Sequence, residues 1–216
     1  RTPMSSIYGF AELMLMRQFS PERQREIMEK IHRQSEAIIV ILNELLDLAR
    51  LEARGGQDFQ FEALDAREAV GDAVQDFGLP EGREAPQLQL TDAALPVWVD
   101  AGKLQRVLRN LLSNAYKYSP LGGTVALRLR REDERVCIEV QDHGIGMSEA
   151  ELAHVTERFY RADKSGQIPG TGLGMSIVKD IMGLMHGGLS LRSAPGQGTT
   201  VTVWLPLLHT APAPAP

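Results

Sequence analysis

The chain has 216 residues, of which 43% are hydrophobic and 24% are charged, as in ordinary soluble globular proteins. Its formal net charge of −5 argues against a protein that binds nucleic acid by neutralising backbone phosphates. The single cysteine, Cys137, excludes an internal disulfide framework and any cysteine-rich metal site.

No apolar run approaches the roughly 18 residues that a membrane-spanning helix needs. The longest covers only residues 37–42. We therefore expect that residues 1–216 make no contact with a membrane and that they lie in the cytoplasm. The chain starts at Arg1 without an initiator methionine or a signal peptide. We expect it to be part of a longer protein, whose upstream segments could carry a membrane anchor.

Two helical patterns open the chain. Apolar residues recur at helical spacing over residues 2–16. Ser20 and Pro21 then mark the start of a second helix, which we expect to cover about residues 22–54. A heptad seam runs along this second helix, through Met28, Ile31, Ser35, Ile38, Leu42, Leu45 and Ala49.

A hairpin of two helices cannot bury such a seam alone. We therefore expect residues 1–54 to dimerise with a second copy of the chain into a four-helix bundle. The alternative is a helical hairpin that packs against its own domain.

A different pattern begins after Gly55 and Gly56, which end the second helix and start a linker over residues 55–60. A helix after residue 100 would be capped by Asp100. We expect further helices near residues 66–77, 149–156 and 173–185, and strands near residues 86–90, 96–99, 124–132, 135–142 and, as a closing hairpin, 189–206. Largely antiparallel strands with helices between them predict an α+β sandwich, a sheet with helices on one face.

Three glycines at alternate positions, Gly170, Gly172 and Gly174, lead into the last of these helices. A glycine-rich turn at a helix start points free N–H groups at phosphate. No lysine follows Gly174, so the P-loop pattern fails. The spacing, and the polar segment before the loop, do not fit the dinucleotide-binding fingerprint either.

A carboxylate after a strand is a first partner for such a loop. Asp142 follows the strand at residues 135–142, and there it can accept a hydrogen bond from an exocyclic amine. Gly144 and Gly146 permit a close approach of backbone or ligand. Alone, this pattern also fits a simple turn.

Two asparagines on one helix are a second partner. Asn110 and Asn114 lie four residues apart on one face, and amide oxygens suit Mg²⁺. Lys117 follows one turn later, within reach of the same phosphates. Alone, paired asparagines more often face solvent.

Together and in this order, these segments resemble the ATP-binding domain of sensor histidine kinases of two-component systems. That domain has the Bergerat (GHKL) fold of the gyrase, Hsp90 and MutL ATPases. The segments similar to the N, G1, F and G2 boxes and to the final strand motif are residues 110–119, 142–147, 157–163, 170–178 and 196–206. Residues 1–10 resemble the end of the H box in the dimerisation and phosphotransfer helices.

The resemblance implies a domain order. Residues 1–54 would be the dimerisation and histidine-phosphotransfer hairpin, and residues 61–208 the catalytic ATP-binding domain. Residues 209–216, rich in proline and alanine, would be a disordered tail.

The resemblance also implies roles around ATP. Asp142 would recognise the adenine amino group, with support from Thr199 through water, and Tyr118 would flank the ring. The segment 161–170 would be a lid. Phe159 could contact the ligand, but we expect it instead to pack the base of the lid against the core. The phosphates would be held by Gly170, Thr171, Gly172, Leu173 and Gly174, at the start of the following helix.

For the transferred phosphoryl group, the resemblance implies that Asn114 coordinates Mg²⁺ and that Asn110 supports the phosphates. Lys117 and Arg161 would neutralise developing charge. Thr2 would orient water for dephosphorylation of the response regulator; alternatively, it only caps a helix.

The chain departs from the family at one place. The family motif reads His-Glu-Leu-Arg-Thr-Pro, whereas this chain starts at the arginine, so we expect the phosphoacceptor histidine just before Arg1. None of the five histidines present stands in for it.

The predicted function is ATP-dependent phosphorylation of that histidine, followed by transfer to an aspartate of a receiver domain. The alternatives are a clamp-like ATPase of the gyrase type and a non-catalytic, nucleotide-binding dimeric scaffold.

Overall fold

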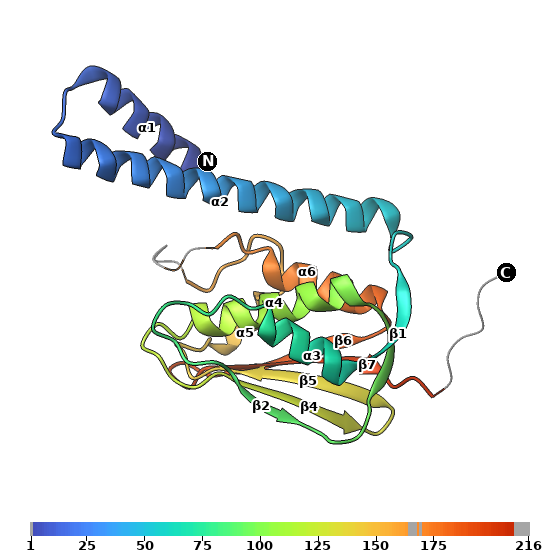
Figure 1. Cartoon of the computed structure of the whole chain (residues 1–216). Helices are drawn as coiled ribbons and strands as arrows, with labels where there is room; N and C mark the ends of the chain where they lie inside the picture. The colour runs from blue at the N-terminus through green and yellow to red at the C-terminus, as the bar shows by residue number, and fades with distance from the viewer. Residues whose placement is uncertain (1, 164–167, 169, 210–216) are drawn as a thin grey trace. The chain divides into compact units, whose positions relative to one another are not determined.

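The computed structural model describes residues 2–163, 168 and 170–209 (Figure 1). Most of the expected tail and much of the expected lid therefore lie outside the described residues. The chain divides into two compact units, Arg1–Ala53 and Arg54–Pro216. Within the described residues, no helix is both long enough and apolar enough to cross a membrane.

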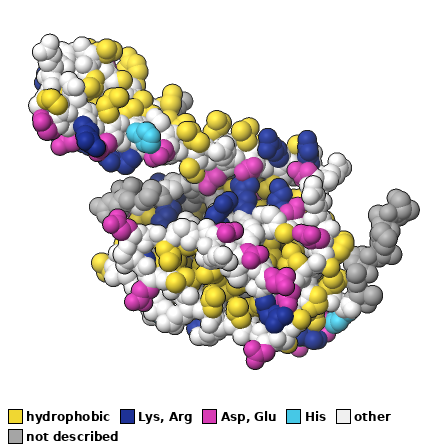
Figure 2. Space-filling view, viewed as in Figure 1, with side chains coloured by type: hydrophobic (Ala, Val, Ile, Leu, Met, Phe, Trp, Pro, Cys, Tyr) yellow, Lys and Arg dark blue, Asp and Glu magenta, His cyan; other side chains and the backbone are white. Residues whose placement is uncertain are grey.

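The first unit is a helical hairpin of α1 (Thr2–Met16) and α2 (Pro21–Arg54), close to the predicted bounds. The ammonium of Lys30 on α2 lies 5.7 Å from the ring centroid of Phe10 on α1. The heptad seam nevertheless leaves apolar surface exposed, at 58% for Met28 and 54% for Leu42. Figure 2 shows such hydrophobic side chains on the surface of the hairpin.

The second unit contains a five-stranded sheet in the order β2-β4-β5-β7-β6. Pairing is antiparallel except between β2 and β4, which are parallel. A hairpin joins antiparallel strands, so the parallel pair of β2 and β4 shows that this sheet is not built of hairpins alone. The strands are β2 (Gln87–Leu90), β4 (Ala126–Glu132), β5 (Arg135–Gln141), β6 (Gly188–Ser193) and β7 (Thr199–Pro206).

Helices cover one face of this sheet, as predicted (Figure 1). They are α3 (Ala66–Gln75), α4 (Ala101–Lys117), the short α5 (Glu149–His154) and α6 (Gly174–Leu184). A separate pair of strands, β1 (Phe61–Asp65) and β3 (Pro96–Asp100), was only half predicted. The five residues of β1 carry no clear alternation, and their strand forms by pairing with β3.

Helix α4 carries the central part of the core. Its apolar stripe recurs every three or four residues, and Leu104, Leu108, Leu111 and Leu112 are almost fully buried. As predicted, Asp100 caps its start: the carboxylate accepts the N–H of Lys103 at 2.9 Å. The register of this helix therefore fixes where its polar residues emerge.

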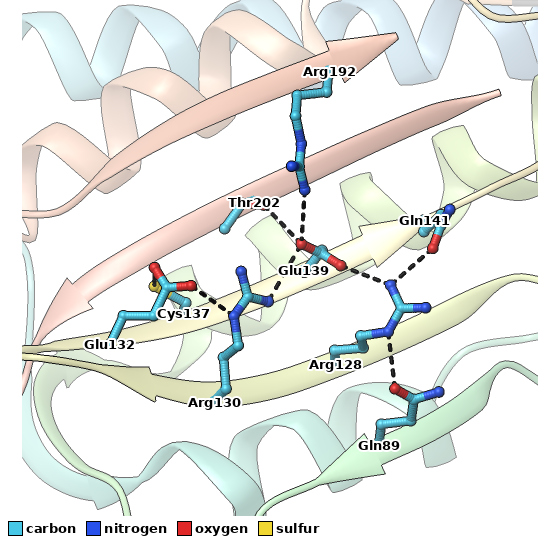
Figure 3. Close-up of polar contacts among 9 residues, drawn as sticks. All are labelled: Gln89, Arg128, Arg130, Glu132, Cys137, Glu139, Gln141, Arg192 and Thr202. Carbon is cyan, nitrogen blue, oxygen red and sulfur yellow. Dashed lines mark hydrogen bonds and ion pairs between the residues drawn. The ribbon is translucent and has the colours of Figure 1, made fainter. Parts of the chain in front are cut away.

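The opposite face of the sheet carries a charged cluster around Glu139 (Figure 3). Ile138 and Val140 point into the core, so Glu139 between them points to the other face, where it is only 4% exposed. Its carboxylate lies 2.7 Å from Arg128 Nη1, 3.3 Å from Arg130 Nη1 and 3.4 Å from Arg192 Nη2. Burial pushes the pKa of Glu139 up, but the hydrogen bonds and charges of Arg128 and Arg130 outweigh it and hold the pKa below its ordinary value.

We expect Glu139→Gln to lower the free energy of unfolding by about 1–3 kcal/mol at neutral pH, because three guanidinium groups lose their shared counter-charge. A carboxylate with a lowered pKa stabilises the fold above its unfolded pKa, and this contribution is lost as the pH falls through the folded pKa. The difference from the parent should therefore shrink below the ordinary value of 4.5. Urea unfolding at several pH values measures both effects.

Glu62→Gln is the matched control, because Glu62 is exposed on β1 and the same charge is removed. An equal loss of stability in both variants would contradict a special role for the cluster.

Candidate functional site

Five segments of the second unit meet around the C-terminal half of α4. They are the end of α4, the loop after β5, the residues before the lid, the start of α6 and the β6–β7 turn. A Cβ atom added to Gly170 would lie 2.3 Å from Lys117 Nζ, and one added to Gly174 would lie 3.8 Å from Asn110 Oδ1. The glycine loop therefore lies against the polar side of α4, as the order of motifs predicts.

Asp142 is a buried carboxylate at the end of β5, only 6% exposed. Its Oδ1 accepts the N–H groups of Gly144 at 2.8 Å and Thr199 at 3.2 Å. Burial nevertheless raises the pKa of Asp142, and these two hydrogen bonds only partly offset it. Among the described residues no hydrogen bond reaches Oδ2, so this oxygen can accept one from a ligand.

Thr199 contacts Asp142 through its backbone, because its N–H donates directly to the carboxylate. Its support of the adenine through water stays a prediction. The Thr199 hydroxyl lies 2.9 Å from Ser193 Oγ, which also accepts the N–H of Met147 at 2.8 Å. The sequence analysis missed Ser193, because a serine before a turn has many ordinary roles.

The glycines after Asp142 allow backbone to pack on backbone. A Cβ atom at Gly144 would lie 2.0 Å from the carbonyl oxygen of Tyr118, and one at Gly146 would lie 1.9 Å from that of Ala194. Gly146 also has a φ of +64°, which side chains rarely adopt. The N–H of Ile145 between them donates to the carbonyl of Tyr118 at 3.0 Å. Gly144 is therefore needed for the loop to reach the end of α4, and Gly146 for the loop to pack against the β6–β7 turn.

The polar residues of α4 emerge on one side of the helix. Asn110, Asn114 and Lys117 are each of intermediate exposure. Lys117 Nζ lies 4.7 Å from the ring centroid of Tyr118, the residue that ends the helix. Burial raises the pKa of Tyr118; the positive charge of Arg161 opposes this shift. These residues therefore form one cluster.

The polar side chains of α4 could supply only some of the ligands that a magnesium ion needs. No group of three or more His, Cys, Asp or Glu side chains that could hold a metal occurs among the described residues. The half-buried amide of Asn114 supplies a single oxygen. Mg²⁺ usually keeps waters and substrate phosphates as ligands, so one amide together with a bound polyphosphate fits its preferences.

Arg161 lies at the start of the lid and contacts lid residues. Its Nη2 lies 2.5 Å from the carbonyl of Ile168 and 3.5 Å from Asp163 Oδ2, which also accepts the N–H of Ile168. Its Nε is buried and has no hydrogen-bond partner among the described residues. One donor of this guanidinium is therefore buried without a hydrogen bond in this arrangement of the described residues.

Phe159 corrects a prediction. Its side chain is 61% exposed instead of packing the base of the lid against the core. Its backbone makes the contact instead, because its N–H donates to the carbonyl of Gly172 at 3.0 Å. A Cβ at Gly172 would lie 2.7 Å from the carbonyl carbon of Phe159, and Gly172 has a φ of +76°. Phe159 itself has a φ of +65°.

The start of α6 has the features of an anion site. Leu173 occupies the N-cap position, and no side chain caps the helix within the described part of the chain. Thr171 Oγ1 accepts the N–H of Leu173 at 3.1 Å, which shapes the turn before the helix. The first N–H groups of a helix have no partner within it, and they carry the positive end of its dipole.

One predicted site residue, Thr2, belongs to the first unit, where it opens α1. Its side chain lies outside the described features, so its predicted role stays a prediction.

Comparisons with known proteins agree with this arrangement. Residues 99–209 match the family of histidine kinase-, DNA gyrase B- and HSP90-like ATPases. Residues 1–54 match the His Kinase A (phospho-acceptor) domain. The match to the ATPase family covers the end of β3, α4, the sheet strands from β4 onward and the glycine loop.

Relatives in sequence include histidine kinases. The chain is 36% identical, over 95% of its length, to the circadian input-output histidine kinase CikA of Synechococcus elongatus. It is 35% identical, over 96% of its length, to the histidine protein kinase DivJ of Caulobacter vibrioides. It spans only 28% and 36% of the lengths of these two proteins.

Solved structures share the fold. The Acinetobacter baumannii histidine kinase AdeS matches with a TM-score of 0.77 and 21% identity, over 96% of each chain. Full-length ShkA in complex with AMPPNP matches with a TM-score of 0.71 and 24% identity, over 100% of this chain and 45% of the other. At these identities the likeness concerns the fold alone. The matches of residues 1–54 and 99–209, with the sequence relatives, show that the chain belongs to the sensor histidine kinases of two-component systems.

Proposed function

We propose that the chain is the catalytic core of a protein-histidine kinase that uses ATP and Mg²⁺ to phosphorylate a histidine just upstream of Arg1. The phosphoryl group then passes to an aspartate of a response-regulator receiver domain. The observation that carries the proposal is the buried Asp142, whose Oδ1 is occupied by two backbone N–H groups while Oδ2 is open to a ligand.

The adenine side of the proposed site is built on Asp142. Its Oδ2 would accept a hydrogen bond from the exocyclic amine of the base, and this bond would offset part of the free-energy cost of burying the carboxylate. Thr199 holds the carboxylate in position, and Tyr118 flanks the ring. Gly144 and Gly146 act indirectly, because they let the loop pack against the end of α4 and against the β6–β7 turn, respectively.

The phosphate side is built on α4 and the start of α6. The backbone of Gly170, Gly172 and Gly174, with Thr171 and Leu173 between them, would donate to the phosphates. Bound Mg²⁺ would supply charge neutralisation at the phosphates. Asn114 would be its protein ligand, and Asn110 would orient the phosphates from the next turn of the helix.

Lys117 and Arg161 would stabilise the transfer itself. A ring nitrogen of the histidine forms a bond to the γ-phosphorus, and the bond from that phosphorus to the β–γ bridging oxygen breaks, leaving ADP. Charge then builds on the departing oxygen and the transferred group. Lys117 already lies beside the glycine loop. Arg161, at the start of the lid, would supply the second positive charge.

The same proposal covers the hairpin. Residues 1–54 would join a second copy through the exposed heptad seam. Thr2, near the phosphoacceptor, would orient water when the receiver domain is dephosphorylated.

The first test extends the chain upstream to include the expected histidine and incubates it with labelled ATP and Mg²⁺. We expect a label that is labile in acid and stable in base, and we expect Asn114→Ala to reduce its formation by at least about 100-fold. Ser113→Ala, at an exposed neighbouring position, should retain labelling. Stoichiometric ATP binding without any transferred label would sink the kinase proposal and favour a clamp ATPase or a scaffold.

A second prediction separates stability from binding at Asp142. Asp142→Asn keeps an oxygen for the two backbone donors but replaces Oδ2 by an amide donor, which faces the donor of adenine. We expect binding of ADP with Mg²⁺ to fall below detection in isothermal titration calorimetry.

The stability of the same variant should not fall at neutral pH. Because the native pKa of Asp142 is raised, the ionised carboxylate lowers the stability of the parent as the pH rises from the ordinary value of 3.8 through the native pKa. Asparagine has no such charge. Thermal melting of Asp142→Asn, beside Asp92→Asn at an exposed loop position, tests this; a clear loss of stability in Asp142→Asn alone would contradict it.

A third prediction concerns the hairpin. Leu42→Lys places a charge in the heptad seam and should convert a dimer into a monomer in sedimentation velocity. Val40→Lys makes the same kind of change at 51% exposure outside the seam, and should leave the dimer intact. Dimers of equal strength in both variants would rule out the seam as the interface.

A further inference from the structure

We propose that Arg83, in the loop between α3 and β2, is a positioning residue that holds the C-terminal end of α4 and thereby sets the affinity for nucleotide. The inference rests on the proposed function, because it concerns the same site. Arg83 itself touches none of the residues assigned there to the bound nucleotide.

The guanidinium of Arg83 binds four acceptors at the end of α4. Nη1 donates to the carbonyl oxygens of Tyr116 at 3.2 Å and Ser119 at 2.9 Å. Nη2 donates to Ser119 Oγ at 3.0 Å and to the carbonyl oxygen of Gly123 at 3.3 Å. These acceptors lie 33 to 40 residues from Arg83 along the chain, so the contacts are wholly tertiary. A single side chain therefore links one carbonyl of the last helical turn, that of Tyr116, to the chain that follows the helix.

Tyr116 on α4 also contacts the loop between α3 and β2. Its ring lies 5.0 Å from Cζ of Arg83 and stacks on Phe77 at 5.5 Å between centroids. Its hydroxyl donates to the carbonyl of Glu84 at 2.8 Å. Hydrogen bonds therefore join the loop and α4 in both directions: Arg83 of the loop donates to α4, and Tyr116 of α4 donates to the loop.

A solvent-open surface pocket of about 300 Å³ borders this junction, lined by Phe77, Gly78, Pro80, Ser113, Tyr116 and Lys117. Lys117 borders this pocket and also faces the glycine loop, so the two sides of the helix end are close.

The loop after Asp142 packs against the same C-terminal end of α4 that Arg83 contacts. Ser119, 1% exposed, donates its hydroxyl to the carbonyl of Ala115 at 2.6 Å while accepting from Arg83. The neighbouring carbonyl of Tyr118 accepts the N–H of Ile145, and Gly144 packs against it. A shift of residues 116–119 would therefore move the Asp142 loop together with Tyr118.

Charge acts in the same direction as geometry. The C-terminus of a helix carries a partial negative charge, which opposes a nearby anion. The guanidinium of Arg83 offsets that charge at the point where Lys117 and Tyr118 would meet a nucleotide. Lysine could supply the charge but not the planar fork that reaches four acceptors.

The test measures binding of ADP with Mg²⁺ by isothermal titration calorimetry in the chain as it stands. We expect Arg83→Met to raise the Kd by about tenfold and Arg83→Lys by a smaller factor. Tyr116→Phe removes the hydroxyl bond without changing the charge, and should raise the Kd less than Arg83→Met. Arg131→Met is the matched control, because Arg131 is an exposed arginine at the β4–β5 turn.

A second readout separates positioning from general stability. Hydrogen exchange at the Ile145 amide should become faster in Arg83→Met at temperatures well below its melting midpoint, and it should not change in Arg131→Met. A merely structural role would lower the midpoint and leave both the Kd and this amide unchanged. If Arg83→Met does not fold, Arg83→Lys carries the same two measurements.

The outcomes distinguish this inference from the proposed function. A parent chain that binds no nucleotide overturns the proposed function and, with it, the effect on affinity. A parent that binds, with an unchanged Kd and unchanged Ile145 exchange in the Arg83 variants, overturns only the role of Arg83.

Discussion

The close approach of three backbone segments at Asp142 is the constraint on which the site depends. Glycine is required at each contact, because added Cβ atoms would lie 2.0 Å from the Tyr118 carbonyl oxygen at Gly144, and 2.1 Å from that of Asp142 at Gly198. With these glycines in place, the β6–β7 turn and the end of α4 enclose the carboxylate. Its burial, its raised pKa and its single open oxygen all follow from that enclosure.

Two buried carboxylates of the domain, Glu139 and Asp142, are used in opposite ways. Glu139 is surrounded by three arginines, and its pKa is lowered, so its charge stabilises the fold. Asp142 has only neutral N–H donors, and its pKa is raised, so its charge is retained at the expense of stability. A buried, destabilising carboxylate with one oxygen open to a hydrogen-bond donor is typical of a binding site. The contrast supports a structural role for the first and a binding role for the second.

Local patterns in the sequence predicted the elements whose causes are local. The apolar period and the Asp100 cap gave α4 its position, and with it Asn110, Asn114 and Lys117. Strand β1 was missed, because its pairing with β3 lies more than 30 residues away. The direct bond from Thr199, the exposed Phe159 ring and the contacts of Arg83 depend equally on tertiary neighbours. Motif order indicated which residues form the candidate site, but not the hydrogen bonds that hold them.

Helix α4 connects these observations, because charged groups from its two flanks hold both of its ends. At the start, Asp100 accepts the N–H groups of Lys103 and, from the linker side, Gln60 at 2.8 Å. At the end, Arg83 donates to the carbonyls of Tyr116, in the last turn, and Ser119, just after it. A carboxylate at the N-terminus and a guanidinium at the C-terminus both complement the helix dipole. Between these two ends the leucines of the helix are buried, and they fix the register in which Asn110, Asn114 and Lys117 emerge on its polar side.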